Sequence, residues 1–386
     1  MKKPYRLAIS QIVKDEAHVV ERMLNSIKSI IDCAVFVDTG STDGTQDVIK
    51  KWGEKNNIPV FVYERPFDNF ENSRNYAMQM VKDKSQYAFW LDADETIEVS
   101  PTFDKNKLDK DLYMFNTYIN AMKYTRNECW NTDKNFRWYG PVHEFIISDD
   151  QNISSGLMDG IVVRVQMDGG SWKGNIPDKY KKHSMILEDY IDNKDRNARW
   201  VFYTAQSYHD SASIPDNKAE NEERLRRSVK YYRERIGRFD GYEEERFYSQ
   251  FRVGTISKVL EEPWYKVHQE LLKAYAMDPL RGEPIKVICD HYLNNGEWHL
   301  AYLYTTFAMA NFHGKNPYPT RLLFVDESLY VWRFLEIHSA ACFYTNRLDE
   351  GKKTYKELLD TIKKTPEHFT REDINKIQSN AQFFGA

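Results

Sequence analysis

The sequence predicts an α/β domain over residues 1–175 followed by an all-α region over residues 176–386, and three observations favour this fold class. Short apolar runs alternate with segments of helical periodicity in the first part of the chain, as in α/β proteins with a parallel sheet. Acidic residues directly follow several of these runs. After a glycine-rich stretch at residues 169–177 only helical patterns continue, which indicates a change of domain.

The composition is that of a globular protein with more than one core. The chain has 386 residues, 41% of them hydrophobic and 29% charged, and a chain of this length usually divides into two domains. Its formal net charge of −4 argues against a general affinity for nucleic-acid phosphates. No apolar run has transmembrane length and no signal-peptide pattern opens the chain, so we expect no membrane span and a cytoplasmic location.

The four cysteines, Cys33, Cys129, Cys289 and Cys342, show no spacing typical of a metal site. Cys33 lies among apolar neighbours, where a reduced thiol packs well. We interpret all four cysteines as structural.

The first part of the chain reads as strands that alternate with helices. Apolar runs predict strands at residues 7–13, 34–37, 60–63 and 87–91. Helical spacing predicts helices at residues 16–31, 43–52 and 73–81. Shorter strands are expected at residues 112–118, 136–139, 144–147 and 161–165. The alternation implies a parallel sheet with right-handed crossovers.

Two carboxylates stand at the exit of the strand predicted at residues 87–91. Side chains at i and i+2 of an extended chain point the same way, so Asp92 and Asp94 would face one side. Such oxygen ligands suit Mg²⁺ or Mn²⁺. An Asp-x-Asp triplet alone is more often a solvated turn, and the buried run before it favours the metal site.

Ligands of parallel sheets bind beyond the carboxyl ends of the strands. Residues 14–16, 38–43 and 92–94 all fall at such ends, so three acidic strand ends are expected to converge on one crevice. The sequence contains no glycine-rich dinucleotide fingerprint and no Gly-Lys-Ser/Thr phosphate loop. A dehydrogenase or an ATPase is therefore not favoured.

The order of these motifs carries a resemblance to a known family. Lys14-Asp-Glu16, Asp38-Thr-Gly-Ser-Thr-Asp43-Gly-Thr45, Asn72-Ser-Arg74-Asn75 and Leu91-Asp-Ala-Asp94-Glu95 follow one another at strand ends and turns. Over about residues 5–170, this resembles a family 2 glycosyltransferase with a GT-A (Rossmann-like) nucleotide-sugar-binding fold. The combination is specific where no single motif is.

The resemblance implies roles for individual residues. Asp38 and Glu16 would bind the base and ribose, Asp92 the ribose or metal, and Asp94 the metal, Mn²⁺ or Mg²⁺. The full set of implied nucleotide-sugar contacts is Val13, Lys14, Glu16, Asp38, Asp43, Arg74, Asp92 and Ala93. Simpler interpretations stay open: Asp38 or Asp43 could cap a helix, Glu16 could interact with a helix dipole, and Arg74 could form a surface ion pair.

A later segment resembles the acceptor side of a subgroup of these transferases. It contains Arg126, Trp138-Tyr-Gly140 and Val142-His-Glu144. The resemblance makes Glu144 the candidate catalytic base and lets His143 position the donor or acceptor. A structural salt bridge from Glu144 to Arg126 or Arg137, and a partly buried structural role for His143, are the alternatives.

The chain departs from the subgroup near the end of this domain. Residues 163–170 contain Gln166 and Asp168 but no histidine, whereas the subgroup often carries one. If that histidine is a metal ligand in relatives, this protein would hold the ion differently or with more water.

The region after residue 179 is predicted to contribute only helices and no strand of the sheet. The helices are expected at residues 180–190, 198–209, 219–237, 242–260, 264–277, 284–295, 298–312, 328–344 and 348–362. Ala274, Asp278-Pro279 and Gly296-Glu-Trp298 give the pairs a layout similar to degenerate tetratricopeptide repeats. Such stacks usually bind a protein partner, and a helical cap or a homodimer contact is the alternative.

These observations predict a metal-dependent, hexosyl-type glycosyltransferase that uses a nucleotide-diphosphate sugar, with a UDP-sugar favoured and inversion expected. The acceptor would be a protein, a glycan or, less favoured by the net charge, a modified nucleic-acid base. The alternative from another class is a catalytically degenerate domain that serves as a helical-repeat scaffold. A nucleotidyltransferase also uses paired acids, but the sequence lacks a basic phosphate loop near the first strand.

Overall fold

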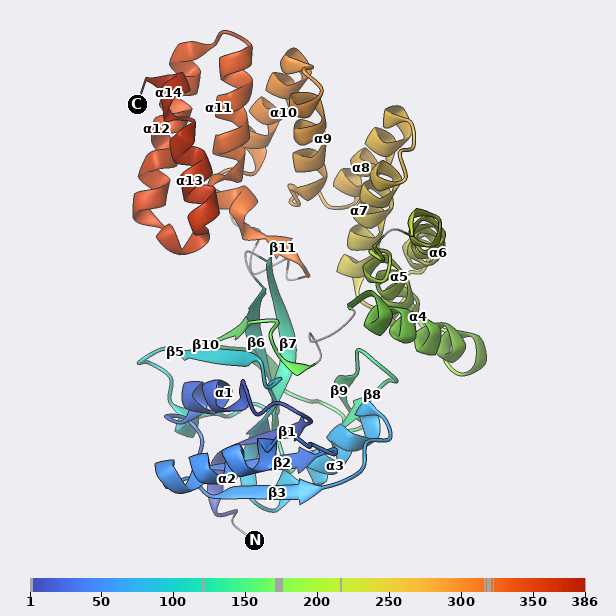
Figure 1. The fold of residues 1–386 in the computed structure, drawn as a ribbon, viewed down its shortest axis with the longest axis vertical. Helices are drawn as coiled ribbons and strands as arrows, with labels where there is room; N and C mark the ends of the chain where they lie inside the picture. The colour runs from blue at the N-terminus through green and yellow to red at the C-terminus, as the bar shows by residue number, and fades with distance from the viewer. Residues whose placement is uncertain are drawn as a thin grey trace. The chain divides into compact units, whose positions relative to one another are not determined.

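The structure is a computed structural model that describes residues 3–119, 122–170, 176–215, 217–315, 317, 321 and 323–385. It divides into two compact units, one made of residues 1–120 and 124–194 and the other of residues 121–123 and 195–386. Figure 1 shows strands in the first unit and mostly helices in the second. Helix α4 (Ile176–Asn193) belongs with the sheet rather than with the later helices, to which the predicted limits 1–175 and 176–386 would assign it.

The first unit is built on one mixed sheet. Its strands follow the order β3-β2-β1-β4-β7-β6-β10-β5. Their bounds are β1 Tyr5–Val13, β2 Cys33–Asp38, β3 Val60–Glu64, β4 Ser85–Phe89, β5 Glu95–Val99, β6 Leu112–Ile119, β7 Met122–Asn131 and β10 Ser155–Val165. Strands β1 to β4 pair in parallel, so their carboxyl ends meet at one edge. A small hairpin of β8 (Phe136–Tyr139) and β9 (Phe145–Ser148) lies apart from this sheet.

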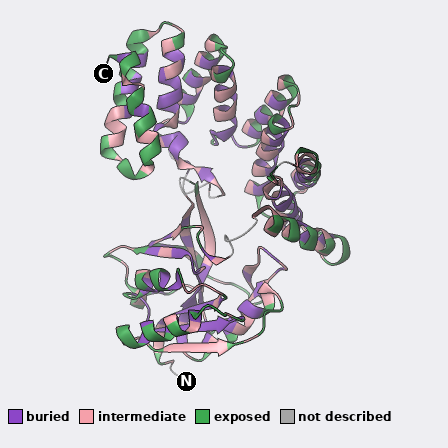
Figure 2. Ribbon diagram, in the orientation of Figure 1, coloured by how far each residue is buried: buried purple, intermediate pink, exposed green. Residues whose placement is uncertain are grey.

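Helices cover both faces of the parallel half. Helices α1 (Val20–Ile27) and α2 (Thr45–Asn56) pack on one face through Leu24, Trp52 and their neighbours. Helix α3 (Phe70–Lys82) packs on the other face against Ala8 and Val35. All six residues of β2 are buried, whereas the edge strand β3 is only partly buried (Figure 2). A strand covered on both faces reads as a continuous apolar run, which is why these strands were predictable.

The two acids of the Asp-x-Asp triplet lie in a turn and not in an extended strand, so the predicted geometry is wrong. Strand β4 ends at Phe89, and the Glu95 N–H donates to the Asp92 carbonyl at 3.0 Å. The side chain of Asp92 is about half exposed, whereas Asp94 is 5% exposed. The turn therefore separates the surroundings of the two carboxylates.

The second unit is a stack of paired helices. The pairs are α5 (Ala198–Asp210) with α6 (Lys218–Ile236), α7 (Glu243–Val259) with α8 (Trp264–Met277), α9 (Glu283–Asn294) with α10 (Trp298–Asn311), and α11 (Phe334–Tyr344) with α12 (Leu348–Lys364). Two short helices that the sequence did not predict, α13 (Arg371–Ser379) and α14 (Ala381–Phe384), follow. The predicted order of a GT-A type sheet domain and a helical region is confirmed.

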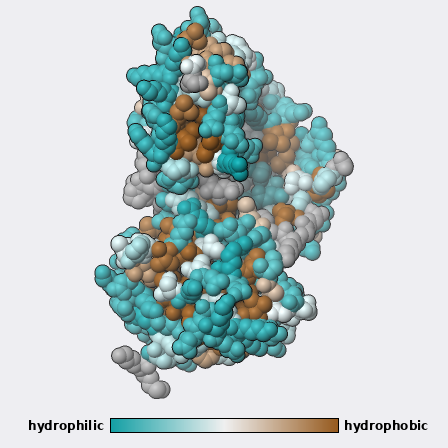
Figure 3. Space-filling model, turned by 60° about the vertical axis from the view of Figure 1, so that its left-hand side comes forward, coloured by the Kyte–Doolittle hydropathy of each residue, from teal (hydrophilic) through white to brown (hydrophobic). Residues whose placement is uncertain are grey.

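One expectation for the helical region is wrong. Residues Val325–Asp326 form a short strand, β11, that pairs antiparallel with Met122 and Lys123 at the start of β7. A two-residue strand has no periodicity to detect, and the free edge of β7 supplies its hydrogen-bonding groups. No helix among the described residues is both long and apolar enough to cross a bilayer. On the face drawn in Figure 3, hydrophobic residues form separate patches among hydrophilic ones.

Candidate active site

Asp38 ends β2 with its carboxylate under the following turn. It is 2% exposed, and its Oδ1 accepts hydrogen bonds from the N–H groups of Gly40 at 2.8 Å and Ser41 at 2.7 Å. Its Oδ2 is buried and has no hydrogen-bond partner in the described part of the chain. Leaving a buried acceptor unpaired is costly, so this oxygen is suited to a donor group of a ligand.

Asp43 fixes loops rather than facing a crevice. Its Oδ1 accepts from the Thr45 N–H and its Oδ2 from the Ala17 N–H, both at 3.0 Å. Desolvation raises the pKa of Asp43, but the hydrogen bonds from Thr45 and Ala17 outweigh it, so the pKa lies below the ordinary value. Two further predicted contacts differ in exposure: Val13 is buried at the end of β1, and Lys14 is exposed.

Asp94 and Glu16 are held by backbone amides of consecutive glycines. The Gly169 N–H donates to Asp94 Oδ2 at 3.3 Å, and the Gly170 N–H donates to both carboxylate oxygens of Glu16 at 3.0 Å. A Cβ atom at Gly169 would lie 3.0 Å from the Cβ and Cγ of Asp94. The glycines, predicted only as a linker, are thus part of the site because a side chain would not fit.

The carboxylates of Asp94 and Glu16 accept hydrogen bonds from backbone N–H groups, and Lys179 interacts with Asp94 electrostatically. Burial raises the pKa of both, with Asp92 adding to the effect on Asp94, and the N–H groups of Gly169 and Gly170 only partly offset it. Raised pKa values in a cluster of acids are typical of a site that binds a cation. Ala93, between the two aspartates, is buried in the turn.

Arg74 joins the acids to the predicted acceptor segment. Its Nε donates to Glu144 Oε1 at 2.6 Å, and its Nη2 donates to Asp92 Oδ1 at 3.2 Å. Its guanidinium carbon lies 4.5 Å from the ring centroid of Trp90 and 4.8 Å from that of Trp138. Because Arg74 is 8% exposed, the alternative of a surface ion pair is wrong.

Glu144 forms its ion pair with Arg74 and not with Arg126 or Arg137, the partners considered from the sequence. Arg137 pairs with Asp149 at 3.0 Å, and Arg126 pairs with two other glutamates. The side chain of Glu144 is 9% exposed. Among the described residues only its Oε1 accepts from Arg74, which leaves Oε2 for a proton or an acceptor hydroxyl.

His143 and helix α4 form the wall next to Glu144. His143 has a φ of 54°, an uncommon conformation outside glycine, and its ring lies edge to face with that of His183 at 5.7 Å. Burial, with Lys179 adding, lowers the pKa of His183 to about 4. Burial also lowers the pKa of Lys179, while Asp92 and Asp94 oppose this shift.

Lys179 and His183 were missed because the sequence placed α4 in the helical region. Their spacing of four residues puts them on one face of α4, and that spacing was the available signal. Residues 163–170, which lack the histidine expected from the subgroup, contact a histidine from another part of the chain. The His18 Nε2 lies 2.9 Å from the carbonyl oxygen of Asp168, and the Asp168 carboxylate pairs with Arg22.

A second acidic cluster lies behind the turn. The Glu95 Oε2 accepts from the Asp92 N–H at 3.0 Å and from Arg126 Nη2 at 2.8 Å. The Arg126 Nε also donates to Glu128 Oε1 at 2.6 Å. Glu95 and Glu128 are buried, and burial raises the pKa of Glu128 to about 8 despite Arg126. Glu95 thereby fixes the backbone of the turn.

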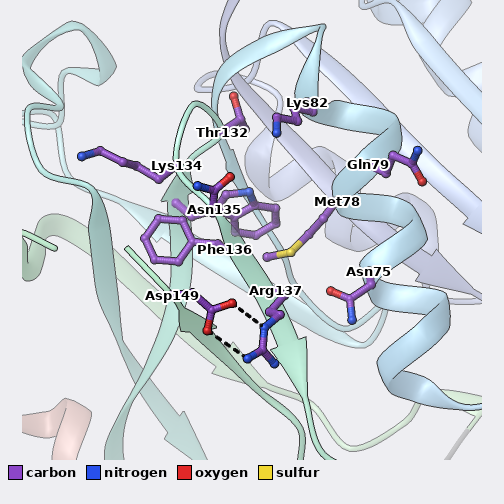
Figure 4. A pocket seen from close by; sticks show the side chains of 11 residues that line it. Asn75, Met78, Gln79, Lys82, Thr132, Lys134, Asn135, Phe136, Arg137 and Asp149 are labelled. Atoms are coloured by element: carbon purple, nitrogen blue, oxygen red, sulfur yellow. Dashed lines mark hydrogen bonds and ion pairs between the residues drawn. The ribbon is translucent and has the colours of Figure 1, made fainter. Parts of the chain in front are cut away.

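A separate hollow lies between α3 and the β7–β8 connection (Figure 4). It has a volume of about 290 Å³ and is lined by Asn75, Lys82, Phe136 and the Arg137–Asp149 pair, among others. Asn75 links it to the site because its side chain exchanges hydrogen bonds with the backbone of Trp138 at 3.0 and 2.8 Å. None of the carboxylates of Glu16, Asp38, Asp92, Asp94 and Glu144 lines this hollow.

The acids fit a hard divalent cation. Asp94 uses Oδ2 for Gly169, and Asp92 uses Oδ1 for Arg74, so each has a further oxygen to offer. Carboxylates of this kind are the usual protein ligands of Mg²⁺ and Mn²⁺. The raised pKa of Asp94 and Glu16 supports this fit.

The match to a known family follows the same residues. Residues 12–103 match the sequence model of glycosyl transferase family 2. The chain carries a family 2 glycosyltransferase domain. The matched segment of the family 2 domain contains Glu16, Asp38, Arg74 and both aspartates of the turn, and it ends before Glu144 and Lys179.

Curated relatives cover parts of the chain. The SPbeta prophage-derived glycosyltransferase SunS of Bacillus subtilis is 23% identical over 233 residues, which are 58% of this chain and 53% of SunS. A TPR repeat-containing protein of Synechococcus elongatus is 25% identical over 149 residues, 36% of this chain and 35% of that protein. The chain thus spans about half or less of these relatives' lengths.

Solved structures resemble the chain at low similarity. TarS of S. aureus gives a TM-score of 0.35 at 11% identity and covers 72% of this chain and 55% of TarS. The mannosyltransferase PcManGT of Pyrobaculum calidifontis, in complex with GDP-Man and Mn²⁺, gives 0.32 at 13% identity and covers 69% and 89%.

Proposed function

We propose that this protein transfers a sugar from a nucleotide-diphosphate sugar, with UDP as the favoured nucleotide, to an acceptor nucleophile. The observation that carries the proposal is Asp94, a buried carboxylate that is held by a backbone N–H and has Asp92 beside it. The family 2 match and the glycosyltransferase name of SunS support the same reaction class. A buried carboxylate such as that of Asp94 costs stability unless a bound cation compensates for it.

The donor half of the site follows from the unpaired acceptors. Asp38 Oδ2 is suited to an N–H group of the base, since it is buried and unpartnered among the described residues. Glu16, next to the glycine turn, is assigned to the ribose, and Asp92 to the ribose or metal. Asp43 holds the turn that carries Asp38, and it acts on the nucleotide only through that turn.

Asp94 and Asp92 would hold the divalent cation, Mn²⁺ or Mg²⁺. When bound, such a cation stabilises the negative charge that grows on the departing diphosphate. Lys179 interacts electrostatically with both aspartates and adds positive charge near them. Its lowered pKa reflects the cost of keeping an ammonium group buried.

Glu144 is the proposed general base. Arg74 holds its Oε1 at 2.6 Å and also binds Asp92, so one guanidinium sets the base relative to the acids. Deprotonation of an acceptor hydroxyl by Glu144 would favour direct displacement, and thus inversion. The rings of Trp138 and Trp90 are buried and pack against the Arg74 guanidinium, so they hold Arg74 in place. The acceptor class, protein or glycan before modified base, follows only from the net charge.

Nucleotide release from a panel of UDP- and GDP-sugars tests the proposal. The full chain should release nucleotide from at least one donor in the presence of Mn²⁺, and the release should fall on chelation. Asp94→Ala should abolish it. If no donor turns over while the folded protein still recruits a protein partner through its helices, the scaffold function is correct instead.

A further inference from the structure

The helical unit contains a cluster that the proposed reaction does not use. His338 and Cys342 lie one turn apart on α11, and Glu350 lies in the first turn of α12. One potential ligand atom from each residue lies within 4.8 Å of the other two. Figure 1 shows α10, α11 and α12 side by side, and the contacts between these helices agree. We propose that His338 Nε2, Cys342 Sγ and Glu350 Oε1 form a Zn²⁺ site.

The distances suit tetrahedral zinc. The Cys342 Sγ lies 3.6 Å from His338 Nε2, and the same Nε2 lies 3.1 Å from Glu350 Oε1. Zinc with a sulfur at about 2.3 Å and a nitrogen at about 2.0 Å separates the two ligands by roughly 3.5 Å in a tetrahedron. The mixed set of thiolate, imidazole and carboxylate is also the chemistry that zinc accepts.

The hydrogen bonds around the cluster aim the ligand atoms inward. The Thr305 hydroxyl donates to the Tyr302 carbonyl at 3.2 Å, and its oxygen lies 3.0 Å from His338 Nδ1. In the tautomer with its hydrogen on Nδ1, a neutral His338 donates to Thr305 and presents a lone pair on Nε2. The Tyr302 hydroxyl donates to Glu350 Oε2 at 2.9 Å, which leaves Oε1 facing the histidine. Such outer hydrogen bonds are typical of metal ligands.

Without a cation, a hydrogen on Nε2 lets His338 donate to Glu350 Oε1, which lies 3.1 Å away. In the Nδ1–H tautomer the Nε2 lone pair faces the same oxygen, and a cation bound by both atoms would take the place of that hydrogen. In the described part of the chain no lysine or arginine lies within ion-pair distance of Glu350.

Helix packing brings the two ligand-bearing helices close together. A Cβ atom at Gly351 would lie 3.1 Å from the Cβ of Cys342, so the glycine after Glu350 allows α12 to approach α11. Cys342 is fully buried and Glu350 is partly exposed, and the cation would therefore enter past Glu350. Zinc binding would convert the Cys342 thiol to a thiolate and release one proton to solvent. The interpretation of Cys342 as purely structural would then be incomplete.

Cobalt substitution tests the site in the full chain. The experiment uses Asp94→Ala protein, freed of metal with a chelator, so that the carboxylates of the family 2 domain do not contribute. Added Co²⁺ should give a thiolate-to-cobalt charge-transfer band, and equilibrium dialysis with Zn²⁺ should give one zinc per chain. One proton per zinc should be released in weakly buffered solution.

Variants separate the site from general metal binding. Cys342→Ser should abolish the cobalt band, and His338→Gln and Glu350→Gln should lower zinc affinity by at least about 10–100-fold, the range seen even for outer contacts. Cys289→Ser, which removes another buried cysteine of the same unit, should change neither. Helix content measured by circular dichroism checks that each variant folds. Glu350→Gln should disturb the fold least, because Glu350 is partly exposed. No band in the parent protein, or a band lost in Cys289→Ser and kept in Cys342→Ser, would overturn the proposal.

Discussion

Two acidic clusters flank the same turn, and they are neutralised in different ways. Behind the turn, Glu95 and Glu128 share the guanidinium of Arg126 at 2.8 and 2.6 Å. In front of it, Asp94 and Glu16 are held by the N–H groups of Gly169 and Gly170. The rear cluster thus contains its own cation, whereas the front carboxylates are held by peptide dipoles.

The difference separates a structural cluster from a binding cluster. Buried carboxylates that share an arginine fix the backbone, as Glu95 does by accepting the Asp92 N–H. Carboxylates held only by N–H groups keep further lone pairs for a ligand. Burial alone does not make this distinction, because Glu95 and Asp94 are exposed by only 1% and 5%.

The largest effect is expected from removing the front acid itself. Asp94→Ala should lower turnover by roughly 10³-fold or more, since it removes a proposed metal carboxylate and with it charge stabilisation in the transition state. The fold should persist because the change removes one 3.3 Å hydrogen bond from the Gly169 N–H and, with it, a carboxylate whose burial costs stability. Asp83→Ala changes an exposed aspartate at the end of α3 and should leave turnover intact. Near wild-type turnover of Asp94→Ala at saturating Mn²⁺ would remove the metal assignment.

The next effect concerns the proposed base. Glu144→Gln should lower kcat by roughly 10²-fold, the usual scale for losing a general base, while donor affinity stays nearly unchanged. The matched control is Asp149→Asn, which removes an exposed carboxylate that pairs with Arg137. A loss confined to donor affinity would place Glu144 in the nucleotide site and leave the base unassigned.

A smaller effect is expected at the glycine that holds Asp94. Gly169→Ala adds a methyl group 3.0 Å from the Asp94 side chain, so the carboxylate must shift. Mn²⁺ affinity, measured from the dependence of donor hydrolysis on metal concentration, should fall by about 10-fold. Gly237→Ala, where the added atom meets its nearest neighbour at an ordinary 3.5 Å, should not change it. Equal affinities in the two variants would mean that the contact to Gly169 does not position the acid.

The parallel half of the fold was predictable because its strands are buried on both faces. Strand β2 reads as a continuous apolar run that ends at Asp38. Strand β1 is mostly apolar but contains the buried polar residues Ser10 and Gln11. Strands β5 and β7 were missed because they contain the buried Glu95 and Glu128 and the partly buried Arg126. A charged residue in a strand reads as exposed until its partner on another strand is known.

The sequence predicted which residues form the site, but it did not predict which of them contact one another. The sequence marks Asp38, Asp94 and Arg74, but the bond from Arg74 to Glu144 joins residues 70 positions apart. The roles of Gly169 and Gly170 depend on how closely these glycines approach the side chains of Asp94 and Glu16 in the folded protein. The Arg74–Glu144 bond and the glycine contacts join residues far apart in the sequence. No local pattern in a single sequence shows which distant residues will meet.

The smallest functional effect is expected from the rear cluster, where the change should appear in stability. Burial raises the pKa of Glu128 from 4.5 to about 8. Between these values the folded protein retains a proton that the unfolded chain releases, so the free energy of unfolding falls as pH rises. The slope reaches at most about 1.4 kcal/mol per pH unit for one such group. Glu128→Gln removes this titration while its amide oxygen still accepts from Arg126.

Urea unfolding midpoints between pH 5 and pH 8 measure this effect. The wild-type midpoint should fall with rising pH in that window, and the Glu128→Gln midpoint should fall less steeply, with Glu95 still contributing because burial also raises its pKa. Glu98→Gln alters an exposed carboxylate paired with Arg164 and should keep the wild-type slope. Donor turnover of Glu128→Gln should stay near wild type, because Glu95 still binds the Asp92 N–H. Parallel pH profiles for wild type and Glu128→Gln would show that Glu128 is ionised in the folded protein and that Arg126 neutralises both glutamates.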